Sequence, residues 1–166
     1  NETKKEKYLQ TAKNAFTSLL MTIGKGGALC IDKNGYYWLE ETVVEPPTHI
    51  LNGFLWTLFG VWDYWLLTQD QEAKNLFDKC IKTLKNNLKI FDTGYWSLYE
   101  QSGTKMKMLA SPFYHSLHIV QLKILYKMTN ESIFKEYAEK WEKYKHNWLY
   151  RNFALIYKVI FKIFYY

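Results

Sequence analysis

The sequence predicts a mainly α protein, built from helical hairpins of an incomplete α/α toroid with two short β-hairpins. Apolar residues recur at spacings of three and four along most of the chain, which is the helical period. Segments that are apolar almost all round alternate with half-polar segments, as expected when inner helices are covered by outer ones. Two short runs beside turn residues alternate in polarity, which is typical of hairpins. A plain helical bundle is the structural alternative.

The first half of the chain should hold three helices and one hairpin. Residues 2–22 carry one apolar stripe, and closely spaced glycines end it. Residues 28–41 predict a hairpin that turns at residues 32–35. After the Pro46-Pro47 break, an almost wholly apolar helix should run from Thr48 to about residue 68, followed by an amphipathic helix over residues 71–90.

The second half should repeat this order. The Asp92-Thr93-Gly94 turn leads into a second hairpin over residues 95–109. Ser111-Pro112 favours a helix start, and this helix should reach residue 128. A final amphipathic helix is expected from about residue 132 onward.

Length and composition indicate one domain over residues 1–147, followed by an aromatic, basic helix or tail over residues 148–166. This tail is too charged and too short to predict a transmembrane span. We favour a helix that packs on the core or on a partner over a helix that lies at a membrane interface.

The net charge of +6 indicates an anionic partner. No nucleic-acid-binding motif is present, so a polyanionic polysaccharide is favoured over nucleic acid. The aromatic content of 19 % suits stacking on sugar rings, although a bulky core explains it too. Cys30 and Cys80 are far apart and indicate buried thiols without a metal, cofactor or disulfide framework. A homo-oligomer and the remainder of a longer chain stay open as partners, and no feature assigns a compartment.

The stretch from Ser111 to His118 is a candidate proton-transfer site. A helix that begins at Pro112 places Tyr114, His115 and His118 in its first two turns, which brings a phenol and two imidazoles together. Hydrogen-bonded structural roles for the same side chains are the alternative.

Three segments, in this order and spacing, resemble the C-terminal domain of D-glucuronyl C5-epimerases. They are Trp38-Leu39-Glu40-Glu41 followed by residues 45–54, then residues 91–99, and then residues 111–122. The resemblance implies abstraction of the C5 proton of a glucuronate residue in a polysaccharide such as heparan sulfate or a related glycosaminoglycan, and return of a proton from the other face. No metal or cofactor is expected.

The resemblance also implies the residues of the site. Tyr99, Tyr114 and Glu41 correspond to catalytic positions of the family. A third family tyrosine follows the Glu-Glu pair, and Thr42 stands there in this chain, although Tyr36 or Tyr37 offers a phenol on the same hairpin. Substrate-binding roles are expected for six further residues: His115, His118, Glu40, His49, Asn52 and Trp96. The alternative is a catalytically inactive polysaccharide-binding domain or a purely structural helical domain.

Overall fold

Helices dominate the computed structural model, which describes residues 5–165. The helices are α1 (Glu6–Leu20), α2 (Leu51–Thr68), α3 (Gln71–Asn87), α4 (Pro112–Thr129), α5 (Ser132–His146) and α6 (Trp148–Tyr165). Strands β1 (Leu29–Ile31) and β2 (Tyr37–Leu39) form an antiparallel pair, and short 3-10 turns cover Ile23–Lys25 and Leu88–Phe91. The predicted mainly α class is confirmed. The toroid itself stays a prediction.

The chain divides into two compact units. The first contains the chain up to Pro47 together with Gly53–Leu84, and the second contains Thr48–Asn52 together with the chain from Lys85 onward. The division of the sequence at residues 147 and 148 into a domain and a tail stays a prediction.

The first unit holds α1, the β-hairpin and most of α2 and α3. The rings of Phe16 and Tyr64 stack with centroids 4.5 Å apart and join α1 to α2. Strand β1 pairs with β2 in the register that places Cys30 beside Trp38. The buried Trp38 ring packs on Phe54 of α2 at 5.3 Å. The hairpin predicted over residues 28–41 is therefore confirmed, and its tryptophan belongs to the core.

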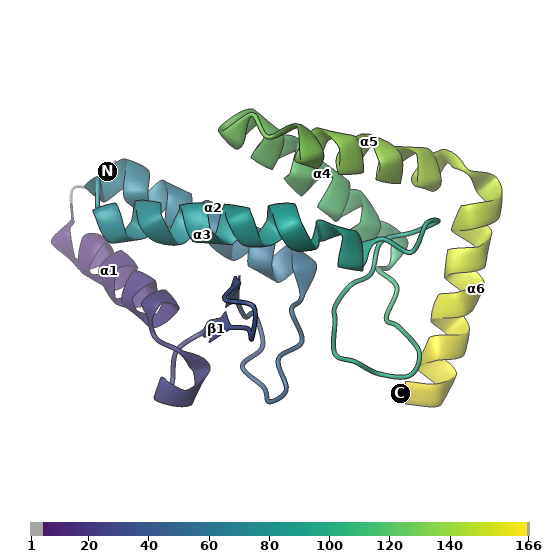
Figure 1. Ribbon diagram of the computed structural model, residues 1–166, viewed down its shortest axis with the longest axis horizontal. Helices are drawn as coiled ribbons and strands as arrows, with labels where there is room; N and C mark the ends of the chain where they lie inside the picture. The colour runs from purple at the N-terminus through teal and green to yellow at the C-terminus, as the bar shows by residue number, and fades with distance from the viewer. Residues whose placement is uncertain (1–4, 166) are drawn as a thin grey trace. The chain divides into compact units, whose positions relative to one another are not determined.

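The second unit centres on the α4–α5 hairpin (Figure 1). Asn130 adopts the left-handed conformation at the end of α4, with φ of 57°, and lets the chain reverse within two residues. Buried side chains fill the space between these helices: Leu122, Leu125, Phe134, Ala138 and Trp141. After Asn147, α6 follows and packs against the loop that precedes α4, since the Met106 N–H donates to the Tyr165 hydroxyl at 3.2 Å.

Two expected elements differ from the structure. In the described part of the chain, the second hairpin does not form strands. Asp92 pairs with Ser97, and Leu98 pairs with Leu109, only as isolated bridges. The helix expected from Thr48 begins at Leu51 instead.

Both differences have a long-range cause. The backbone N–H of Leu51 donates to the Tyr99 carbonyl at 3.0 Å, and the Gln101 N–H donates to the Thr48 carbonyl. These bonds commit the Leu51 N–H and the Thr48 carbonyl to the loop, so they are not available for an earlier helical turn.

None of the helices within residues 5–165 is long and apolar enough to cross a membrane.

Candidate functional site

The Asp-Thr-Gly turn positions the segment that carries the first candidate tyrosine. The Asp92 carboxylate accepts a hydrogen bond from the Gly94 N–H at 3.0 Å, and Lys140 of α5 forms an ion pair with the same carboxylate. Thr93 Oγ1 donates to the Trp96 carbonyl at 2.8 Å and accepts from its N–H at 2.9 Å. Gly94 has a φ of 86°, a conformation that glycine adopts without strain. The turn is thus fixed by its own side chains and tied to α5.

Tyr99 and Tyr114, the two tyrosines expected to be catalytic, lie side by side. Ser111 is the N-cap of α4 and accepts from the Tyr114 N–H at 3.3 Å, which confirms the predicted helix start. The Tyr99 N–H donates to the Met108 carbonyl at 2.8 Å. The two rings meet edge to face with centroids 4.9 Å apart.

The tyrosine pair opens onto a groove of about 490 Å³ between the loop, the start of α4 and α6. The residues that line it are Tyr99, Met108, Ser111, Tyr114, Lys158, Phe161 and Lys162. We call this hollow the tyrosine groove. It combines two phenols with two cations, so it offers proton donors and acceptors beside groups that attract a carboxylate or sulfate.

Lys158 is the half-buried cation of the tyrosine groove. Its ammonium lies 5.9 Å from the centre of the Tyr99 ring and donates to the Leu109 carbonyl at 2.8 Å. Burial lowers the pKa of Lys158, and the positive charge of Lys162 lowers it further. An anion that entered the groove would relieve this repulsion.

His115 and His118 of α4 belong to a buried network centred on Ser97. The Ser97 hydroxyl lies 2.8 Å from His115 Nδ1 and 3.0 Å from His118 Nδ1. The Ser97 N–H donates to His115 Nδ1 at 3.2 Å, so that nitrogen is an acceptor, and His115 Nε2–H faces the Trp141 carbonyl at 3.0 Å. The network therefore assigns a chain in which His118 Nδ1–H donates to Ser97 and the Ser97 hydroxyl donates to His115.

Both imidazoles are neutral and fully buried in this arrangement. Burial lowers the pKa of His115 to about 4. Burial, together with the nearby His115, lowers the pKa of His118 to about 3. Trp96 stacks flat on His115, with centroids 3.8 Å apart, and its Nε1–H donates to the Ala110 carbonyl. All three side chains are thus buried inside the second unit, and their contact with substrate stays a prediction.

The remaining polar candidates of the second unit are His49 and Asn52. His49 is half-buried and has a φ of 50°. Asn52 is buried, and its backbone carbonyl accepts from Gln121 Nε2 of α4 at 3.0 Å, which links the start of α2 to α4. The Asn52 Oδ1 has no hydrogen-bond partner among the described residues.

Glu40 and Glu41 belong to the first unit. Glu40 is buried. Burial of the Cys30 thiol raises its pKa, and the negative charge of Glu40 raises it further. Glu41 packs against Gly53 so closely that a Cβ on this glycine would lie 2.6 Å from Glu41 Cβ. Gly53 therefore permits close packing against the candidate carboxylate of Glu41. Thr42 is exposed.

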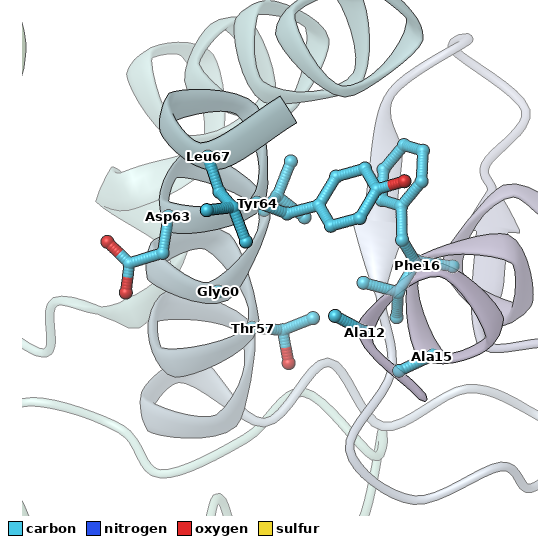
Figure 2. A pocket seen from close by; sticks show the side chains of 10 residues that line it. Ala12, Ala15, Phe16, Thr57, Gly60, Asp63, Tyr64 and Leu67 are labelled. Carbon is cyan, nitrogen blue, oxygen red and sulfur yellow. The ribbon is translucent and has the colours of Figure 1, made fainter. Parts of the chain in front are cut away.

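The first unit also contains a hollow, of about 370 Å³, between α1 and α2 (Figure 2). Its apolar surface comes from residues that include Ala12, Phe16, Tyr64 and Leu67, and Asp63 contributes a carboxylate. This hollow lacks the cations and paired phenols that uronate chemistry needs, so the tyrosine groove is the better candidate. Across residues 5–165, no three side chains of His, Cys, Asp or Glu gather as metal ligands.

The sequence alone did not indicate Ser97, Lys158 or Lys162 as site residues. Ser97 is a small polar residue between the bulky Trp96 and Leu98, and this was the available signal. The lysines belong to α6, and only folding brings them to the tyrosines.

Comparison with known proteins agrees with the resemblance. The family model described as D-glucuronyl C5-epimerase C-terminus matches residues 1–143. An uncharacterized protein of Methanocaldococcus jannaschii is 32 % identical over 139 residues, covering 82 % of this chain and 44 % of that relative. A D-glucuronyl C5-epimerase of Caenorhabditis elegans is 28 % identical over 163 residues, covering 86 % of this chain and 26 % of that relative. The chain thus spans less than half the length of either relative.

Proposed function

Since the chain belongs to the family of D-glucuronyl C5-epimerase C-terminal domains, we propose that its tyrosine groove exchanges the C5 proton of glucuronate residues in an anionic polysaccharide. The observation that carries this proposal is the edge-to-face pair of Tyr99 and Tyr114 in a groove that also contains Lys158. The family provides the reaction, and the groove provides groups of the required chemistry.

The proposed step is proton abstraction next to a carboxylate. A deprotonated tyrosine takes the C5 proton, and the electron pair left behind spreads onto the carboxylate as an enolate-like dianion. This charge requires a cation close to the carboxylate, and Lys158 is the candidate because it lines the groove beside the tyrosines. Return of a proton to the opposite face of C5 then gives the epimer, and return to the same face restores glucuronate.

The two tyrosines serve one face of the sugar. A ring sandwiched between two side chains needs a gap of roughly 7–8 Å, twice the usual contact distance of carbon atoms. The centroids of Tyr99 and Tyr114 are only 4.9 Å apart, so a sugar does not fit between them. The group for the opposite face therefore lies outside this pair.

Solvent deuterium tests the proposal. The protein is incubated in D₂O with a non-sulfated glucuronate polymer and, separately, with heparan sulfate, and deuterium at C5 is measured by NMR after depolymerisation. We expect incorporation that falls about 100-fold or more in Tyr114→Phe and in Tyr99→Phe, because phenylalanine keeps the ring and removes the acid–base group. Tyr126→Phe, in the same helix but outside the groove, is the matched control. Incorporation that survives both groove substitutions would contradict the proposal.

A second candidate function is an inactive polysaccharide-binding domain. Thr42, at the position of the third family tyrosine, favours it, because a threonine hydroxyl is too weak an acid to replace a phenol. This candidate predicts that the polymers bind without any C5 exchange, and that Tyr114→Phe leaves the affinity unchanged.

A further inference from the structure

Helix α6 exposes an apolar face along its whole length. Only Ala154 and Phe161 of this helix are buried hydrophobic residues. Nine large apolar side chains are more than 40 % exposed: Trp148, Leu149, Phe153, Leu155, Ile156, Val159, Ile160, Ile163 and Phe164. Side chains of this size leave several hundred Å² of apolar surface in water, roughly the upper limit for a soluble monomer. Packing on the core, one of the two packing roles predicted for this helix, therefore does not account for most of its apolar residues.

These side chains form one continuous face. At 100° per residue they fall within about half of the helix circumference, because Leu149, Ile156 and Ile163 repeat every seven positions and their neighbours fill the spaces between. The buried side of the helix, at Ala154 and Phe161, points the other way.

Every ionic side chain of α6 is a cation. Arg151, Lys158 and Lys162 lie on one border of the apolar face, and the helix contains no Asp or Glu. Arg151 and Lys162 are exposed, whereas Lys158 turns inward to the Leu109 carbonyl. The last turn of α5 adds Lys143, Lys145 and His146 directly before this helix.

We propose that α6 lies on an anionic lipid surface, with its apolar face in the acyl boundary and its exposed cations, Arg151 and Lys162, at the headgroups. A helix with an apolar face containing Trp, Phe and Leu and a basic polar face has the composition of interfacial helices. Charge complementarity favours this occupant over a second copy of the chain, because two α6 helices would bring cations toward cations.

Vesicle co-sedimentation tests this proposal with the 166-residue chain. The vesicles contain phosphatidylcholine with about 30 % phosphatidylserine, or phosphatidylcholine alone. The test variant is Ile156→Glu/Ile163→Glu, whose positions are 59 % and 74 % exposed. The control variant is Val120→Glu, which makes a similar change at a 51 % exposed position of α4. Circular dichroism and sedimentation velocity establish the folding and the oligomeric state of each protein.

The proposal expects binding to the anionic vesicles that exceeds binding to the neutral ones and weakens from about 0.05 M to about 0.5 M salt. The double variant should lose about 10-fold or more of the partition coefficient, and Val120→Glu should change it by less than about 2-fold. Binding that survives the double substitution would overturn the proposal. A folded protein that binds neither kind of vesicle would overturn it too. This holds for a monomer and for a dimer that the double substitution dissociates.

Discussion

Acidification from pH 7.5 to pH 5.0 should destabilise the protein through the two buried imidazoles. In the unfolded chain each histidine gains a proton near pKa 6.5, whereas in the fold burial delays protonation to about pH 4 for His115 and about pH 3 for His118. The unfolded state therefore binds protons first as the pH falls. The stability that neutral burial provides is complete above pH 6.5 and is lost progressively down to about pH 4 and pH 3.

The size of the effect follows from these pKa values. At pH 5.0 an imidazole with an unfolded pKa of 6.5 and a folded pKa of 4 or below costs about 2 kcal/mol of unfolding free energy. The two histidines together give an upper limit of about 4 kcal/mol, because they are close enough to affect one another.

Urea unfolding at both pH values measures this loss. We expect His118→Asn to lose only about half as much stability between the two pH values as the parent, since asparagine can still bond to the Ser97 hydroxyl but does not titrate. His146→Asn is the control, because His146 is exposed and lies outside the Ser97 network. A parent that loses less than about 1 kcal/mol, or an equal loss in all three proteins, would refute the reasoning.

Two further predictions concern α2 and the tyrosine groove. Gly53→Ala should lower the unfolding free energy by about 1–3 kcal/mol, because the new Cβ collides with Glu41. Gly60→Ala, in the same helix with open space around it, should raise it by about 0.5–1 kcal/mol. Urea unfolding measures both variants, and shifts of the same sign would contradict the close packing of Gly53 on Glu41. Lys158→Met should weaken binding of a glucuronate polymer about 10-fold, as measured by calorimetry. Lys127→Met, on the exposed side of α4, should leave the affinity unchanged. Equal affinities of the two variants for the polymer would exclude Lys158 from the binding site.

Local signals predicted the elements that local bonds fix. The α4 start is confirmed because Ser111 and Pro112 supply the cap and the first helical residue within one turn. The β1–β2 hairpin is confirmed because Asp32 Oδ1 accepts from the N–H groups of Asn34 and Tyr36 and closes the turn.

Long-range bonds decided what the sequence could not predict. The loop before α4 stays irregular because tertiary bonds satisfy its polar groups, such as Gln101 Nε2 donating to the Ile90 carbonyl at 2.9 Å. Helical spacing indicated that Tyr114, His115 and His118 were close, but spacing does not say which face is buried. Contacts with Trp96 and Trp141 decide that, and they turn both imidazoles inward.

The site was predictable only in part for the same reason. The family motifs indicated Tyr99 and Tyr114, and the structure brings these two together. Lys158 lies beyond the family match and reaches the groove only because α6 packs on the loop before α4.

A crystal structure of the protein with a bound glucuronate oligosaccharide tests the central claim most directly. Our account predicts a uronate in the tyrosine groove, with its C5 within hydrogen-transfer distance of a phenol oxygen of Tyr99 or Tyr114 and its carboxylate beside Lys158. An oligosaccharide bound elsewhere on the chain, with the tyrosine groove free of sugar, would contradict it.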